Sequence, residues 1–404
     1  MPWAQHCQDL AANPAATLFK RRFGHAPAHL VRAPVALTLL GSLASAADGV
    51  LLGVAVDRHV SLAAAPRSDG RIEIVHPLAI DGCAFWLGDF AAESAFEWAR
   101  PIKTMLAALQ QRGVHFSGFS AALHDNVPAG FDARTSLETA TLMLIRRVHP
   151  FTLTDAGLAA PPRRDPRTQE IPAATDQQLC HLAKLCRAAR GGVAGAGLLA
   201  DPFTPLLGRA WHALAVDWQT GGVERWPFAG TAVVFCDAGE LAPGDARIAE
   251  FAEALASALV KLNLRSLRSV DPAFLQTNRT RLGPREAVAV SHVAAENRWI
   301  VRGESVLREA DHRQFGQFLW LSHESARDAL QAVSPEAERL VQSARKHPAC
   351  LGSRALYETG RIATVSLVDY HNVEAFVAHL ALEAKRQFGR DIRPLVLPIV
   401  DGAG

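Results

Sequence analysis

The sequence predicts an α+β fold built from two domains, on three observations. The chain has 404 residues, which is more than a single hydrophobic core usually organises. Hydrophobic residues make up 49% of the chain and charged residues 20%, which is the balance of a globular protein. Apolar runs typical of strands are mixed with helical periodicity, but without the regular strand–helix alternation of a doubly wound parallel sheet.

Most of the expected strands lie in the first third of the chain. Residues 29–41 and 50–66 are rich in Val, Leu and Ala, as expected for strands buried on both faces. A turn at 67–70 followed by a short strand at 71–75 predicts a hairpin with the strand before it. Further strands are expected over 114–124 and 363–369. Helices are expected over 8–23, 97–112, 136–148, 175–190, 246–262, 286–306, 311–332 and 372–387.

Composition and charge exclude several partner classes. The formal net charge is +2, so the chain carries no bulk charge that would favour nucleic acid or an anionic membrane. The N-terminus shows no basic segment followed by an apolar one, and Asp48 and Gly49 interrupt the apolar run at 34–56. We therefore expect a cytoplasmic protein with no nucleic-acid or membrane partner.

Several segments, in order along the chain, resemble galactokinases of the GHMP kinase family. The matching segments include residues 18–24, 32–34, 54–60, 67–70, 193–203, 203–214, 292–297, 315–325 and 333–341. The resemblance implies a ribosomal-protein-S5-like domain over residues 1–200 and a GHMP kinase domain over 201–404. It also implies ATP, Mg²⁺ and a small sugar as ligands. The Pro- and charge-rich loop at 150–172 is longer than in the family and is expected to be a surface insertion.

Phosphorylation of a sugar requires a carboxylate near the attacking hydroxyl, a cation for the transferred phosphoryl group, and polar groups that hold the sugar. The family motif R-A-P-G-R-V-N-L-I-G-E-H-x-D-Y aligns without gaps on residues 32–46. Ala36 then stands at the position of the catalytic arginine. The sugar-binding positions fall on Ser42 and Ser45, with Leu43 between them in place of a histidine. Leu43 has no group that can hydrogen-bond a sugar hydroxyl.

The phosphate loop of the family, P-x-G-x-G-L-S-S-S-A-A-L-E, corresponds to residues 128–138 but is two residues shorter here and keeps one glycine. The resemblance assigns nucleotide binding to Gly130, Arg134, Thr135 and Ser136, and Mg²⁺ binding to Ser136 and Glu138. Residues at this start of a helix are also good capping types, so a purely structural role is the competing interpretation.

Two further family motifs are only partly present. The glycine-rich pattern G-A-R-M-T-G-G-G-F-G-G falls on residues 352–362, where bulky or charged side chains including Tyr357, Glu358 and Arg361 replace glycines. The pattern V-G-x-x-C-G-I-M-D-Q-F falls on residues 193–203 and places Asp201 at the catalytic aspartate. An Asp–Pro pair is equally typical of a turn.

Three interpretations remain open. In the first, the chain is a pseudoenzyme on a galactokinase-like scaffold that binds a small sugar or a protein partner. In the second, it is an active small-molecule kinase of altered specificity, using ATP and Mg²⁺ with Asp201, Arg134 and Ser136. In the third, the cleft carries out a different chemistry. We favour the first, because replacements affect three separate loops while the framework of the family is kept.

Overall fold

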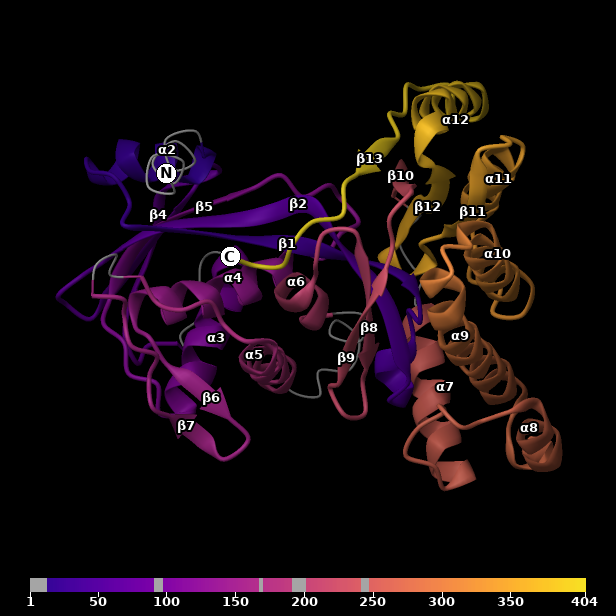
Figure 1. Cartoon of the computed structure of the whole chain (residues 1–404), viewed down its shortest axis with the longest axis horizontal. Coiled ribbons are helices and arrows are strands. Elements are labelled where there is room, and N and C mark those ends of the chain that lie inside the picture. The colour runs from indigo at the N-terminus through magenta and orange to yellow at the C-terminus, as the bar shows by residue number, and fades with distance from the viewer. Residues whose placement is uncertain (1–12, 91–96, 167–169, 191–200, 241–246) are drawn as a thin grey trace.

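The computed structural model describes residues 13–90, 97–166, 170–190, 201–240 and 247–404 (Figure 1). Its helices are α2 (Pro14–Phe23), α3 (Arg100–Gln111), α4 (Ala133–Val148), α5 (Asp176–Ala189), α6 (Phe203–Leu207), α7 (Arg247–Leu262), α8 (Pro272–Asn278), α9 (Pro284–Arg308), α10 (His312–Asp328), α11 (Pro335–Arg345) and α12 (Val373–Phe388). Its strands are β1 (His29–Leu40), β2 (Val50–Pro66), β3 (Arg71–His76), β4 (Ala79–Trp86), β5 (Phe119–Asp125), β6 (Thr152–Thr154), β7 (Gly157–Ala159), β8 (His212–Asp217), β9 (Val223–Pro227), β10 (Thr231–Glu240), β11 (Cys350–Ala355), β12 (Arg361–Asp369) and β13 (Leu395–Leu397).

The larger sheet has the order β4-β3-β5-β2-β8-β9, and β1 pairs with β2 beside this path. Helices α3, α4 and α5 lie on one side of it, while α2 lies on the other (Figure 1). An apolar cluster from α3, α4, α5 and the inner strands fills the first side. A smaller cluster that includes Phe19 of α2 and Val75 of β3 fills the second. The sheet is therefore covered on both faces, as its apolar strands require.

The smaller sheet has the order β11-β12-β10-β13, with antiparallel neighbours throughout. Helices α11 and α12 pack against it through one apolar cluster. Helices α7 and α9 share a second cluster, in which Leu43 and Tyr357 are also buried. The observed mixture of sheets and helices confirms the predicted α+β class.

The two sheets are joined by a continuous apolar cluster. It contains residues of β1 and β2 together with residues of β10, β12, α9 and α10. The end of the chain returns to the larger sheet, where the Gly404 and Arg32 backbones exchange hydrogen bonds of 3.1 and 3.0 Å. Helix α4 begins close to the apolar cluster that joins the two sheets. The boundary between domains at 200/201 stays a prediction, and β8 and β9, which follow it in sequence, extend the larger sheet.

The expected strands at 29–41, 50–66 and 363–369 are confirmed as β1, β2 and β12, and the long expected helices are present. Residues 8–12 of the first expected helix lie outside the described residues. The predicted hairpin at 67–75 is wrong, because β5 lies between β2 and β3 and runs parallel to β3. The residue before β5, Gly118, packs directly against the start of β3. A Cβ atom on Gly118 would lie 2.1 Å from the Arg71 carbonyl oxygen, so this position requires glycine.

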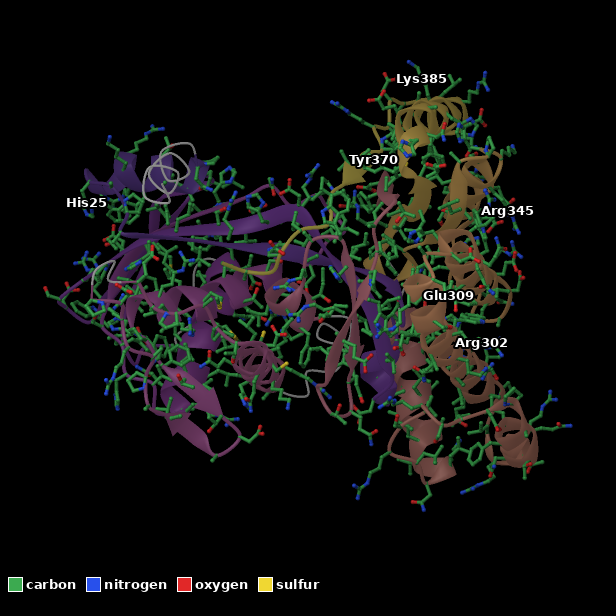
Figure 2. The ribbon with its side chains drawn as sticks, in the orientation of Figure 1. His25, Arg302, Glu309, Arg345, Tyr370 and Lys385 are labelled. Carbon is green, nitrogen blue, oxygen red and sulfur yellow. The ribbon has the colours of Figure 1, made fainter. Side chains whose placement is uncertain are left out.

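Charged side chains gather on the outer surfaces of the helices. Figure 2 shows Arg345 and Lys385 at the outer edge of the helical half of the molecule. Within the described parts of the chain, none of the helices is both long enough and apolar enough to span a membrane. The loop expected at 150–172 contains the short hairpin of β6 and β7.

Candidate functional site

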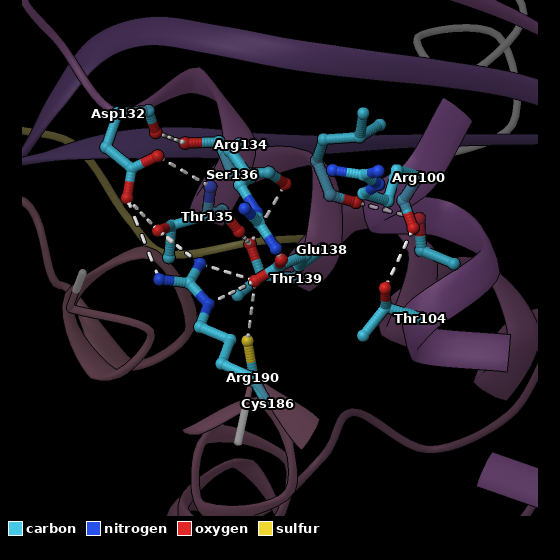
Figure 3. A network of polar contacts seen from close by, with 12 residues as sticks. Arg100, Thr104, Asp132, Arg134, Thr135, Ser136, Glu138, Thr139, Cys186 and Arg190 are labelled. Atoms are coloured by element: carbon cyan, nitrogen blue, oxygen red, sulfur yellow. Dashed lines mark hydrogen bonds and ion pairs between the residues drawn. The ribbon is translucent and has the colours of Figure 1, made fainter. Parts of the chain in front are cut away.

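The start of α4 holds most of the residues that the sequence assigned to nucleotide and metal (Figure 3). Asp132 is the N-cap of the helix, because its Oδ1 accepts a hydrogen bond of 3.0 Å from the Thr135 N–H. Its other carboxylate oxygen contacts the Thr135 hydroxyl. A capping carboxylate at the positive end of a helix is electrostatically favourable. The capping interpretation of this segment therefore has direct structural support.

Glu138, in the second turn of α4, is completely buried and is surrounded by donors. Arg134 Nε lies 3.0 Å from Glu138 Oε1, and Arg190 Nε lies 2.7 Å from Glu138 Oε2. The Cys186 thiol also donates to Oε2, at 3.2 Å. Burial is the main cause that raises the pKa of Cys186 well above its ordinary value, and the nearby Glu138 carboxylate raises it further. This thiol therefore stays neutral.

The hydroxyl groups beside Glu138 are engaged with the protein itself. Ser136 is fully buried, and its Oγ donates to the Pro34 carbonyl oxygen at 3.0 Å. Arg190 Nη2 lies 2.6 Å from the Thr135 hydroxyl oxygen. No group of three or more His, Cys, Asp and Glu side chains arranged to hold a metal ion occurs among the residues that the structure describes.

Asp201 is buried and caps the short helix α6. Its Oδ1 accepts from the N–H groups of Phe203, at 2.9 Å, and Thr204, at 3.1 Å. Its Oδ2 is buried and has no hydrogen-bond partner among the described residues. Burial raises the pKa of Asp201 above its ordinary value, although the hydrogen bonds act in the opposite direction. Residues 193–200 of the same motif lie outside the described part of the chain.

Of the two positions assigned to the sugar, Ser42 is packed with protein atoms. Ser42 is buried, and its Oγ accepts a hydrogen bond of 2.9 Å from Arg354 Nη2. Ser45 belongs to the short 3₁₀ helix Ala44–Ala47, and its side chain lies outside what the structure describes. Leu43 and Tyr357 are both buried in the cluster formed by α7 and α9. The Tyr357 hydroxyl lies 3.2 Å from His292 Nε2.

The loop before α4 is covered from the smaller sheet. A Cβ atom on Gly130 would lie 2.8 Å from Arg361 Cδ, so the Arg361 side chain lies directly against this glycine. Arg361 is held in place by Asp237, whose Oδ2 is 2.9 Å from Nη2. Beside it, the rings of Phe131 and Phe235 have centroids 4.7 Å apart. The backbone of this loop therefore faces protein side chains.

An open cavity of about 340 Å³ remains on the other side of the first turn of α4. Trp98, Arg100 and Arg134 contribute to its lining, together with His76 and Asp125. The His76 ring stacks on Trp98 with a centroid separation of 5.6 Å. His76 Nε2 lies 3.9 Å from Asp125 Oδ2, and this interaction holds the pKa of the Asp125 carboxyl below its ordinary value. The cavity combines an aromatic wall with both acidic and basic side chains, including Glu97, which suits a small, flat and polar ligand.

Sequence reasoning missed Arg190 and Cys186, which complete the polar cluster around Glu138. Cys186 lies in α5 and Arg190 directly follows it, about fifty residues further along the chain. Local motifs cannot reveal such a contact, because it depends on how α5 packs beside α4. The feature of the sequence that points to this contact is an arginine at the end of an amphipathic helix, directly before two glycines.

Comparison with known proteins gives a consistent result. No protein-family model matches the sequence. The galactokinase of Chloroflexus aggregans is 28% identical over 392 residues, which cover 94% of this chain and 93% of that protein. Human galactokinase is 26% identical over 353 residues, covering 83% and 82% respectively. The structure of Lactococcus lactis galactokinase complexed with galactose matches with a TM-score of 0.80 at 19% identity, covering 96% of this chain and 98% of that one.

A mevalonate kinase structure also matches over 93% of this chain, with a TM-score of 0.60 at 12% identity. The chain has the GHMP kinase fold. Its sequence is galactokinase-like along almost its whole length. In this GHMP kinase fold, the assigned position Gly130 lies between the two sheets, where Arg361 of the smaller sheet reaches it.

Proposed function

We propose that this galactokinase-like protein does not phosphorylate galactose and instead has a binding or regulatory role. The observation that carries the proposal is the packing around Ser42 and Leu43. Leu43 and Tyr357 are 1% and 5% exposed and belong to one apolar cluster, so both side chains are packed within the protein. Ser42 is engaged by Arg354. A sugar entering here would have to displace buried apolar contacts, each of which stabilises the fold.

The groups expected to act on a transferred phosphoryl group support the same proposal. Ala36 offers a methyl group where the family has an arginine, and a methyl group cannot stabilise developing negative charge. Arg361, the cation nearest Gly130, is already paired with Asp237 and Glu240. We therefore expect ATP–Mg²⁺ to bind weakly or not at all at the loop before α4. We propose the cavity beside Trp98 as the binding site for a small ligand. The alternative within the same binding role is that the chain binds a protein partner.

The alternative function is an active ATP-dependent kinase of altered specificity. One observation favours it: Asp201 Oδ2 is buried without a hydrogen-bond partner among the described residues, as a carboxylate reserved for a substrate hydroxyl would be. The open cavity bordered by Arg134 would then admit the nucleotide. In this alternative, ATP and Mg²⁺ are required cofactors.

A coupled ADP-release assay with galactose, ATP and Mg²⁺ tests the proposal. We expect no turnover above the rate without protein. The matched control is Asp201→Asn, which keeps the helix cap but removes the carboxylate. Galactose-dependent turnover that disappears in Asp201→Asn would refute the proposal and establish the kinase function. A screen of other small alcohols and sugars in the same assay extends the test to altered specificity.

A further inference from the structure

The polar cluster at the start of α4 is electrically balanced without any added ion (Figure 3). Two carboxylates, Asp132 and Glu138, face two guanidinium groups, Arg134 and Arg190. Arg190 contacts both acids, because its Nε lies 2.7 Å from Glu138 Oε2 and its Nη1 lies 4.0 Å from Asp132 Oδ2. The formal charges of these four groups therefore sum to zero.

A divalent cation does not fit this arrangement. The family resemblance assigned Mg²⁺ to Ser136 and Glu138, and Mg²⁺ requires several oxygen ligands in a nearly octahedral arrangement. The Ser136 hydroxyl is turned to the Pro34 carbonyl, and both oxygens of Glu138 already accept hydrogen bonds. An added divalent ion would also be repelled by two guanidinium groups at hydrogen-bonding distance from the same carboxylate.

We propose that the Arg190 guanidinium permanently takes the place of a divalent cation at Glu138, which makes this site independent of metal. The inference concerns the site of the proposed function and deepens it. A ligand bound beside α4 would then meet a charge-balanced cluster of side chains instead of an exchangeable ion. The class of ligand that fits is one that binds without a bridging metal ion.

The surroundings of Arg190 support a permanent charge. Its side chain is 8% exposed, and it bonds to Glu138 and to the Thr135 hydroxyl, so its position is fixed from two directions. Burial lowers the pKa of Arg190, but the Glu138 and Asp132 carboxylates and the hydrogen bond to Glu138 together with the other neighbouring groups outweigh it, so the pKa lies above its ordinary value. A further donor to Glu138, the Cys186 thiol, stays neutral. The guanidinium is therefore the ion that balances Glu138 at every physiological pH.

Removing this guanidinium should open a metal site where none exists. In Arg190→Met, Glu138 keeps its ion pair with Arg134, Asp132 loses its contact with Arg190, and the vacated space lies next to the Thr135 hydroxyl. Mn²⁺ is a suitable probe, because it takes oxygen ligands and its binding is measured directly by electron paramagnetic resonance. A metal that binds only the folded state also raises the melting temperature as its concentration increases.

The experiment compares four full-length proteins titrated with Mn²⁺ alone. We expect no Mn²⁺ binding by the natural protein or by Arg187→Met, a control on the same helix whose side chain contacts Trp218 and Asp48. We expect Arg190→Met to melt at a lower temperature, to bind about one Mn²⁺ per chain and to regain melting temperature as it binds. In Arg190→Met/Glu138→Gln both the binding and the recovery should disappear.

Two results would overturn the inference. One is stoichiometric Mn²⁺ binding by the natural protein that Glu138→Gln abolishes. The other is a folded Arg190→Met protein that binds no Mn²⁺. If Arg190→Met is insoluble, its yield of soluble protein with Mn²⁺ present becomes the readout, where recovery supports the inference and no recovery contradicts it. Since the titration contains neither galactose nor nucleotide, an inactive protein that binds Mn²⁺ would refute this inference and leave the proposed function standing.

Discussion

Arg361 on β12 lies against Gly130 in the loop before α4, so closely that a Cβ atom on Gly130 would be 2.8 Å from Arg361 Cδ. Gly130 also has a φ of +92°, a conformation that other residues rarely adopt. Gly130→Ala should therefore lower the free energy of unfolding by about 1–3 kcal/mol, through backbone strain and the close contact together. Urea unfolding followed by circular dichroism measures the change.

The Arg361→Ala background separates the two contributions. Without the Arg361 side chain, Gly130→Ala should retain only the backbone strain and so cost less than in the natural protein. Equal costs in both backgrounds would show that Arg361 does not restrict this loop. The comparison is a double-mutant cycle between residues on the two sheets, so it also measures how strongly Arg361 couples them.

The elements that sequence could predict are those governed by local patterns. Strands β1 and β2 were predicted from their apolar runs, and the capping chemistry at Asp132 was predicted from residue type. The predicted hairpin at 67–75 is wrong because β3 pairs with β5, which follows it in the sequence by more than forty residues. Nothing local to either strand indicates that pairing.

The candidate site was likewise only partly predictable from the sequence. Its motif positions, including Ser136 and Glu138, were located from sequence. The groups that decide their chemistry were not, because Arg190 reaches Glu138 from 52 residues away and Arg361 reaches Asp237 from 124 residues away. The alignment showed which family groups are replaced. Only the packed structure shows that Tyr357 is buried with Leu43.

Tyr357 is predicted to stabilise the protein through both its ring and its hydroxyl. Tyr357→Phe keeps the buried ring but removes the contact with His292 Nε2, so we expect a loss of about 0.5–1.5 kcal/mol in unfolding free energy. Tyr357→Ala also removes the ring from its cluster and should cost about 3–5 kcal/mol. Chemical denaturation distinguishes the two. Similar losses in both variants would mean that the ring is not packed as described.

Glu296 on α9 should give the protein a stability contribution that depends on acid pH. Burial acts to raise the pKa of Glu296, but the interactions with His292, Arg354 and Ser322 together outweigh it and bring it to about 2. An acid whose folded pKa lies below its unfolded pKa stabilises the fold above the unfolded value, near 4.5, and loses that contribution as the pH falls through about 2. Urea unfolding between pH 7 and pH 2 should show this loss.

Glu296→Gln tests that assignment. At pH 7 it should destabilise the protein by about 3–5 kcal/mol, because it leaves the buried Arg354 guanidinium without the nearby Glu296 carboxylate. The difference from the natural protein should shrink as the pH falls below 4.5. Glu304→Gln, on the exposed side of the same helix, removes an ion pair with Arg308 and should change stability by less than about 1 kcal/mol at any pH. A pH-independent effect of Glu296→Gln would contradict the assignment.

Asp201 should show the opposite dependence on pH. Because burial raises its folded pKa, its contribution to stability is fully present below the unfolded value of 3.8 and is lost as the pH rises through the folded value. Asp201→Asn can still accept from the Phe203 and Thr204 N–H groups without carrying a charge. We therefore expect it to match the natural protein near pH 3 and to equal or exceed its stability at pH 7.

Asp201→Ala provides the comparison, because it removes the cap of α6 along with the charge. It should lower the free energy of unfolding by about 0.5–2 kcal/mol, as the loss of a helix cap typically does. Unfolding titrations of the three proteins at pH 3, 5 and 7 make the distinction. If Asp201→Asn is much less stable than the natural protein at pH 7, then the ionised carboxylate stabilises the fold. The unpartnered Oδ2 would in that case have a structural role, which removes the main observation in favour of the kinase alternative.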